Sequence, residues 1–268
     1  MLTTGWQGQI KDEDYFKIKR LSFHDLKDLQ QSSLVYNFRK EHPIESPAMG
    51  LGKLVHMALL EPEKYYVKRW VYAGDKRGKE YKDLLAWLKT PEAPKDTILI
   101  SEDNAQTIEG IKKEIMSGPV YGIMSDPTLK TEQVGFFDLY SEECKMKVDM
   151  VSDSFIYDIK TTSGLEDVSF GYTAKNYNYI TQLVWYAMAA EQIDGKRRQI
   201  GIIAIDVDSP HEHRIYDIDA AMIDRELDRI ANWFVKYREA KESNFSTKMC
   251  QTRKRLWVPS TYWEQYND

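Results

Sequence analysis

The sequence has few cysteines and no long apolar run, and each shortage excludes a class of protein. Only 2 of the 268 residues are cysteine, so the chain cannot form a disulfide framework or a four-cysteine metal cluster, and it suits a reducing compartment. The longest apolar stretch, residues 200–205, is far too short to cross a bilayer. Residues 1–8 lack the basic and apolar regions of a signal peptide. We therefore expect a cytoplasmic protein without a membrane partner.

Several motifs that identify common enzyme classes are also missing. The chain has no Walker A loop and no GxGxxG segment, so nothing supports ATP hydrolysis or Rossmann-type cofactor binding. It has no HExxH segment and no paired CxxC segments, which argues against a zinc protease or a zinc finger. His211-Glu-His213 could bind a metal, but it follows Ser209-Pro210 in a polar turn, where a solvated loop is expected.

An excess of positive charge is the last thing that the chain lacks. Lys and Arg number 37 against 42 Asp and Glu, which gives a net charge of −5, and on charge alone this argues against a nucleic-acid binder. Hydrophobic residues make up 42% and aromatic residues 12% of the chain, as in a globular protein with a substantial core. No repeat or linker divides the sequence. We predict a single domain over 1–268, with a helical part (1–127), a part with a sheet and helices (128–242) and a C-terminal tail (243–268).

Hydrophobic periodicity changes along the chain from helical to strand-like. In the first part, Ser22, Pro47 and Ser101 precede or open helical patterns, and a further pattern lies around residues 81–88. After residue 127 the pattern predicts strands at 132–139, 145–151 and 155–161, then a helix at 179–193, strands at 199–207 and 214–218, and a helix at 223–237. This order predicts an α/β domain with a central mixed sheet flanked by helices.

The segment Asp158-Ile159-Lys160 is the most informative part of the sequence. On a strand, Asp158 and Lys160 leave the same face, and Ile159 points to the opposite face. Asp149 lies on the preceding strand, so cross-strand pairing can bring its carboxylate beside Asp158. Two carboxylates with an adjacent ammonium group form a site for Mg²⁺ or Mn²⁺, where a lysine can orient a water for attack on a phosphodiester. An exposed ion pair worth less than about 1 kcal/mol would also explain Asp158 and Lys160.

Two features elsewhere in the sequence favour the metal site. Gln182 and Tyr186 share one face of a predicted helix at i, i+4 spacing. His56 lies off the apolar stripe of its helix and in line with Gly52, which leaves room for a ligand or another element. From the residues alone, a buried histidine that serves only packing is the alternative.

The ordered set of these residues resembles the RecB-like branch of the PD-(D/E)XK nuclease superfamily. The layout is most similar to the RecE-type exonucleases (exonuclease VIII) of phage-derived recombination systems. The similarity runs from about residue 22 to residue 205 and includes the segments 21–36 and 49–62, Asp149, Asp158-Ile159-Lys160 and Tyr179-Ile-Thr-Gln182 followed by Tyr186.

This resemblance implies a restriction-endonuclease-like fold and a role for each matching residue. The implied metal ligands are His56, Asp149, Asp158 and the backbone carbonyl of Ile159, with Lys160 positioning the attacking water, Gln182 and Tyr186 shaping the site and touching the DNA backbone, and Glu132 as a secondary acidic residue.

The resemblance also implies a substrate and partners. The expected activity is a Mg²⁺-dependent exodeoxyribonuclease, with Mn²⁺ as a substitute, that degrades one strand of linear double-stranded DNA 5′→3′ and leaves a 3′ single-stranded tail. The expected partner is a single-strand-annealing recombinase that loads on the tail, and the expected assembly is a ring-shaped homotetramer. Two alternatives stay open: another endonuclease or repair nuclease of the superfamily, and a non-catalytic DNA-binding protein with the same fold.

Basic residues are concentrated locally in spite of the net negative charge. Residues 196–198 are Lys-Arg-Arg, and between Lys241 and Arg255 five basic residues stand against one acidic residue. These stretches are either solvated faces or DNA contacts, and Arg253, Lys254 and Arg255 are the candidates for DNA binding. A metal-dependent nuclease needs acidic residues at its centre to hold cations, and it needs positive charge only along the path of the DNA. We therefore expect the basic residues to be concentrated around the Asp149–Asp158 cleft.

Overall fold

The computed structural model describes residues 3–42 and 47–246, which form two compact units. The first unit combines Met1–Phe23 with Ile44–Asn232, and the second combines His24–Pro43 with Trp233–Asp268. The first unit contains the central sheet and every described residue of the predicted site. The prediction of a single domain stays a prediction.

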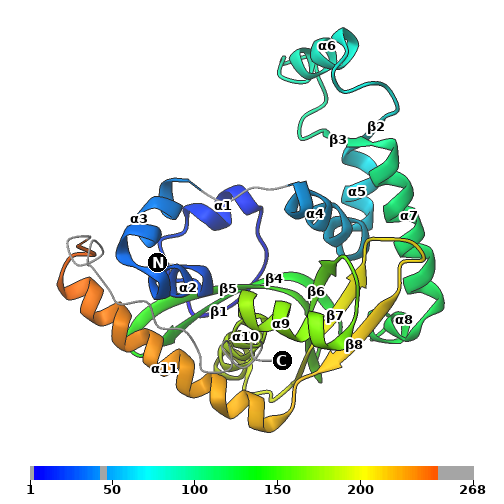
Figure 1. Ribbon diagram of the computed structural model, residues 1–268. Coiled ribbons are helices and arrows are strands. Elements are labelled where there is room, and N and C mark those ends of the chain that lie inside the picture. The colour runs from blue at the N-terminus through cyan, green and yellow to red at the C-terminus, as the bar shows by residue number, and fades with distance from the viewer. Residues whose placement is uncertain (1–2, 43–46, 247–268) are drawn as a thin grey trace, which may run out of the picture. The chain divides into compact units, whose positions relative to one another are not determined.

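A six-stranded sheet forms the centre of the first unit (Figure 1). In spatial order its strands are β1 (Gly5–Gln9), β4 (Lys130–Leu139), β5 (Glu142–Val151), β6 (Phe155–Thr162), β7 (Gln199–Asp206) and β8 (His213–Asp217). Only β6 and β7 pair in parallel, while all other neighbours pair antiparallel. The mixed sheet confirms the predicted fold class.

The turn between β4 and β5 is tighter than predicted. The predicted strands at 132–139 and 145–151 left residues 140–144 for the connection, but β5 already begins at Glu142, and only Tyr140 and Ser141 connect the strands. Both residues have positive φ, 50° and 67°. Two left-handed residues in a row match the twist of an antiparallel hairpin. The turn could not be predicted from the sequence, because Tyr140-Ser141 lacks the Asn-Gly or Gly signals that usually mark a two-residue hairpin turn.

The strand predicted at 199–207 is confirmed as β7, and it is buried on both faces. Its residues from Ile200 to Ile205 are all buried. It lies between β6 and β8 in the sheet, and helices cover its faces. Such a strand needs a continuous apolar sequence, whereas a strand with one solvated face would alternate apolar and polar residues.

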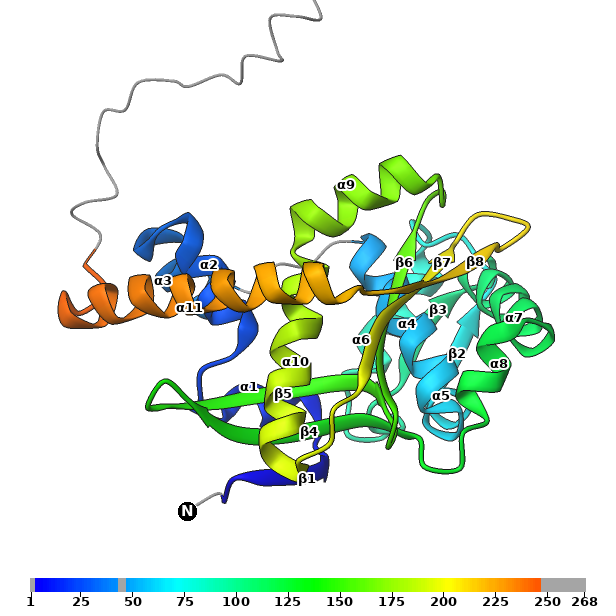
Figure 2. The same cartoon turned by 90° about the horizontal axis from the view of Figure 1, so that it is seen from below.

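Helices of the first unit pack on the sheet from two sides (Figures 1 and 2). Their bounds are α1 (Asp12–Lys17), α4 (Pro47–Leu60), α5 (Pro62–Lys68), α7 (Glu102–Ser117), α8 (Pro119–Met124), α9 (Asp167–Tyr177) and α10 (Tyr179–Asp194). On one side, buried residues of α4 and α7 form a cluster with Tyr157 and Ile159 of β6. The alternate residues of β6 leave the other side, where Lys160 contacts Gln182 of α10.

The predicted helix starts at Pro47 and Ser101 are confirmed. Pro47 is the first residue of α4, and the Ser101 side chain accepts a hydrogen bond from the Asn104 backbone N–H at the start of α7. This N-cap satisfies a donor that has no partner within the helix.

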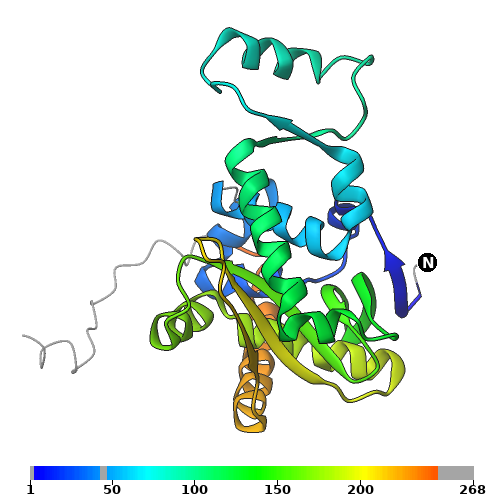
Figure 3. The ribbon, with the colours of Figure 1, turned by 90° about the vertical axis from the view of Figure 1, so that its right-hand side faces the viewer.

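A small extension lies between α5 and α7 in the chain and is separate from the central sheet. It consists of β2 (Arg69–Tyr72), α6 (Lys79–Trp87) and β3 (Ile98–Ser101), with β2 and β3 paired in parallel. Figure 3 shows it standing apart from the sheet. The remaining helices are α2 (Phe23–Gln31), α3 (Ser33–Glu41) and α11 (Ala220–Glu242). Among the described residues, no helix combines the length and apolarity needed to cross a membrane.

Candidate active site

The candidate site lies where β5 and β6 separate. The two strands pair at Met150 with Tyr157 and at Val151 with Ile156. At Asp149, the residue before Met150, a side chain replaces the backbone as the hydrogen-bond partner of β6. Its Oδ2 accepts a hydrogen bond from the Ile159 backbone N–H at 2.9 Å. The strands therefore part at the point where the predicted acidic residues sit, and a carboxylate satisfies the backbone donor that the separation exposes.

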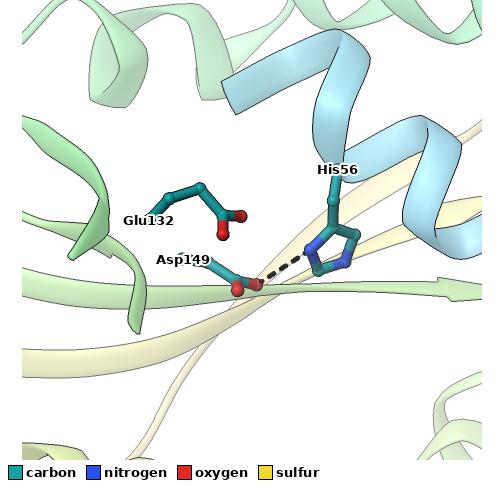
Figure 4. Close-up of side chains that lie close together, drawn as sticks. All are labelled: His56, Glu132 and Asp149. Atoms are coloured by element: carbon teal, nitrogen blue, oxygen red, sulfur yellow. Dashed lines mark ion pairs between the residues drawn. The ribbon is translucent and has the colours of Figure 1, made fainter. Parts of the chain in front are cut away.

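His56, Glu132 and Asp149 come together at this separation (Figure 4). They come from α4, β4 and β5, and their potential ligand atoms all lie within 4.8 Å of one another. His56 Nδ1 lies 3.4 Å from Asp149 Oδ2. An imidazole with two carboxylates, partly buried and close together, is a donor set that fits a divalent cation such as Mg²⁺ or Mn²⁺.

Glu132 reaches this group because of its place in β4. Its neighbours Thr131 and Gln133 pair with Met150 and Val148, so Glu132 stands opposite Asp149. Its backbone is left-handed, with φ of 53°. A non-glycine residue in this conformation costs about 1–2 kcal/mol, so the surrounding structure holds the carboxylate in place at some expense.

Lys147 provides a counter-charge for Glu132. Its Nζ lies 2.7 Å from the Glu132 carboxylate and 2.6 Å from that of Asp12 in α1. Burial raises the pKa of Glu132, repulsion from Asp149 adds to the rise, and Lys147 opposes it. The sequence carried a signal for Lys147, since it lies two strand residues before Asp149 and shares its face.

Asp158 and Lys160 form an ion pair beside the group of three. Their side chains are only 4% and 18% exposed, so this pair is largely desolvated, unlike the surface pair that was the alternative explanation. Lys160 Nζ donates to Gln182 Oε1 at 3.3 Å, and Gln182 Nε2 donates to the Tyr186 hydroxyl at 2.9 Å. A polar chain thus runs from Asp158 through Lys160 into α10.

The close packing of these charges shifts their pKa values in opposite directions. Burial raises the pKa of Asp158 to about 6, with Lys160 opposing the rise and Asp149 adding to it. Burial also works against ionisation of Asp149, but His56 and Lys160 outweigh it and lower the pKa of Asp149. Neighbouring carboxyl groups with separated pKa values are typical of functional sites.

The structure places the predicted site residues in one region, with different groupings from those expected. Asp158 pairs with Lys160 and does not belong to the group of His56, Glu132 and Asp149. Glu132, which was predicted as a secondary residue, does belong to it. The backbone N–H of Ile159 donates to Asp149, and the role of its carbonyl as a metal ligand stays a prediction. Gln182 and Tyr186 are only 8% and 6% exposed. Gln182 contacts Lys160 and Tyr186, and little of either side chain faces solvent.

Gly52 makes room for a neighbouring strand. A Cβ atom at this position would lie 3.0 Å from the Thr161 hydroxyl oxygen on β6. Of the two roles suggested for this glycine, space for a ligand or for another element, the structure supports the second. The close approach of α4 to β6 in turn brings His56 to the site.

Basic residues that were candidates for DNA contact are paired where the structure describes them. Lys196, Arg197 and Arg198 form ion pairs with Asp153, Glu191 and Asp194 at 2.6, 2.7 and 2.7 Å. These partners reduce the charge available for phosphates. Arg253, Lys254 and Arg255 lie outside the described residues.

The His211-Glu-His213 segment is less solvated than expected. Both imidazoles are half-buried. They occupy space that a Cβ would fill at Gly110 of α7 or at Gly118, which lies between α7 and α8. Among the described residues, only His56, Glu132 and Asp149 form a group of three or more potential metal ligands.

Strand topology and site together define a restriction-endonuclease-like fold of the PD-(D/E)XK superfamily. Residues 22–254 match the model of the PDDEXK-like domain of unknown function (DUF3799), and the chain belongs to this family. No curated protein sequence matches the chain.

Comparison with solved structures supports the same fold. A crystal structure from Eubacterium rectale, described as a "putative exonuclease", is similar with a TM-score of 0.63 and 14% identity, and the match covers 97% of this chain and 98% of that one. The structure of SSO0001 also has 14% identity over 81% of this chain and 92% of its own, but its TM-score of 0.27 is too low to inform the fold.

Proposed function

We propose that the protein is a divalent-metal-dependent exodeoxyribonuclease that degrades linear double-stranded DNA 5′→3′ and leaves 3′ single-stranded tails. The observation that carries this proposal is the group of His56, Glu132 and Asp149 beside the buried Asp158–Lys160 pair. The exonuclease specificity rests on the resemblance of the ordered motifs to RecE-type exonucleases. The name of the Eubacterium rectale protein supports it.

His56, Glu132 and Asp149 would hold a divalent ion, with Asp158 as a further ligand once it is released from Lys160. A bound Mg²⁺ or Mn²⁺ supplies Lewis-acid activation of water and neutralises charge on the phosphate. The protein contributes the rest. Lys160 donates hydrogen bonds to the attacking water and to the phosphate, and Gln182 fixes the position of its ammonium group.

The first test is cleavage by purified protein with Mg²⁺ or Mn²⁺ and with EDTA. Linear duplexes labelled at the 5′ or the 3′ end should lose the 5′ label first, and closed circular duplexes should stay intact. Lys160→Ala should reduce cleavage by at least about a hundredfold, in the range typical of a lost catalytic group. Lys113→Ala, which changes an exposed lysine of α7, is the matched control.

The outcomes of this test separate the alternatives. Cleavage of closed circles would favour an endonuclease, and loss of the 3′ label first would favour a repair nuclease of other polarity. DNA binding without hydrolysis in both metals would favour the non-catalytic protein. Full activity of Lys160→Ala would contradict the site assignment.

We further propose that the enzyme acts in the cytoplasm as a ring-shaped tetramer and hands its product to a single-strand-annealing recombinase. A ring around DNA would keep the enzyme on its substrate over many cleavages. Sedimentation of the purified protein measures the subunit number, and a monomer that degrades long duplexes processively would contradict the ring. Co-purification with an annealing protein tests the partner.

A further inference from the structure

Two stacked tyrosines lie at the junction of α9 and α10, the two helices that follow β6 in the chain. Tyr177 ends α9 and Tyr179 begins α10. Asn178 between them has a left-handed backbone, with φ of 59°, which turns the chain sharply. As a result the two rings stack, with centroids 5.7 Å apart and planes inclined by only 17°.

The inner ring of this stack contacts the catalytic lysine. Lys160 Nζ lies 4.8 Å from the centroid of the Tyr179 ring, within the distance for a cation–π interaction. Tyr179 is half-buried. Lys160, Tyr179 and Tyr177 therefore form a continuous series that leads from the reacting phosphate position toward solvent.

The outer ring lies on the packed side of α9 and is still exposed. Tyr177 follows Phe170 and Ala174 at i, i+4, i+7 spacing, and both of these residues are buried. Tyr177 is nevertheless 56% exposed, because the helix ends at this residue. Tyr172 belongs to a different stripe with Val168 and Lys175, and it is 63% exposed. The same helix thus offers one exposed tyrosine beside the site and another that faces away.

We propose that Tyr177 and Tyr179 form a stacking subsite for a nucleobase of the strand that is cleaved. This inference rests on the proposed function, because it assigns a place to the nucleotide next to the phosphate at Lys160. An aromatic ring binds any nucleobase through its face, so the subsite would position the strand without selecting its sequence. It also requires that the base be unstacked from its neighbour, which a frayed or terminal nucleotide allows.

The test compares three changes at Tyr177 with a matched change at Tyr172. Tyr177→Ala and Tyr177→Leu should lower kcat/KM on an ordinary duplex about 5- to 100-fold, the loss expected for one base–aromatic stack. Tyr177→Phe keeps the aromatic ring and should lose much less than Tyr177→Ala, while Tyr172→Ala should keep the wild-type value. The Leu variant keeps apolar volume, and therefore separates loss of stacking from loss of packing.

A duplex with an abasic nucleotide gives the decisive comparison. Three substrates carry the abasic position at, before or after the scissile phosphate. At the position that normally stacks, wild type and Tyr177→Ala should cleave equally well, because there is no base left to bind. If Tyr177→Ala lowers kcat/KM relative to wild type by the same factor on the ordinary duplex and on all three abasic substrates, the subsite is overturned. Equal kcat/KM for Tyr177→Ala and Tyr172→Ala on the ordinary duplex would also overturn it.

A binding measurement keeps the subsite separate from the proposed activity. A single-stranded oligonucleotide with 2-aminopurine should lose fluorescence on binding to the wild type in Ca²⁺, and should lose less with Tyr177→Ala than with Tyr172→Ala. Wild type that cleaves no DNA but shows this difference would contradict the nuclease and support the subsite. Identical quenching by both variants would overturn the subsite even in an active nuclease.

Discussion

At the scale of single residues, Asp149 has two separable roles. It accepts the hydrogen bond from the Ile159 backbone N–H and it faces His56. Asp149→Asn keeps an oxygen that can accept the hydrogen bond but removes the charge, so it should abolish cleavage with little change in stability. Asp149→Ala removes both and should lower the free energy of unfolding by about 1–3 kcal/mol. Urea unfolding and cleavage assays check this, and equal stability of the two variants would contradict it.

His56 should make metal binding depend on pH. Burial opposes the charged imidazolium, but the Asp149 carboxylate outweighs burial and raises the pKa of His56. A cation must displace this proton, so affinity should increase as pH rises toward the raised pKa and level off above it. Titration calorimetry in two buffers of different ionisation enthalpy should detect the released proton.

A variant without the imidazole provides the control for this pH dependence. His56→Ala should bind the cation more weakly. Most of its remaining pH dependence should come from Asp158, whose pKa of about 6 should rise further once the opposing charge of His56 is gone. If the affinity of the wild type for the cation falls as the pH rises, the cation does not displace a proton from His56.

At the scale of elements, the left-handed residue in β4 predicts an unusual order of stabilities. Glu132→Gly and Glu132→Ala both remove the carboxylate, but glycine adopts positive φ without the cost that a Cβ brings. The glycine variant should therefore be more stable than the alanine variant by about 1 kcal/mol, although both should lose affinity for Mn²⁺. Thermal unfolding of the two proteins tests the order, and the reverse order would show that the backbone of Glu132 is relaxed.

Long periodic elements could be predicted from the sequence, and short ones could not. The strands β4 to β7 and the helices α4, α7 and α10 carry enough apolar positions to reveal their period. The helices α1, α5 and α8 have seven residues or fewer, which is under two turns, so no period can be recognised. The extension of β2, α6 and β3 was only partly predicted, because its strands have four residues each.

The site was predictable to the extent that its residues are close in sequence. Strand alternation placed Asp158 and Lys160 on one face, and helical spacing joined Gln182 to Tyr186. The position of His56 off the apolar stripe and in line with Gly52 singled it out, but only the resemblance made it a metal ligand, because a packed histidine explains the same pattern. The grouping of Glu132 with His56 and Asp149, and the pairing of Asp158 with Lys160, could not be foreseen, because they depend on strand register and on which carboxylate Lys160 contacts.

At the scale of the whole molecule, a bound cation should stabilise the fold. An ion that binds only the folded state adds about 2.7 kcal/mol of stability at a free concentration of 100 times Kd. Mn²⁺ should raise the melting temperature of the wild type, and EDTA should reverse the effect. Asp149→Ala should show no such rise, whereas an equal rise in this variant would place the stabilising ion elsewhere.

The first strand of the chain carries a consequence for self-association. Gly5–Gln9 pairs with residues 133–136 of β4 and closes one side of the sheet. Removing these few residues would leave the N–H and C=O groups of β4, the strand that holds Glu132, open to pairing with another copy. The shortened protein should form sedimenting aggregates at concentrations where the full chain stays in solution. A strand that contributes no residue to the candidate site would thereby protect β4 from polymerisation.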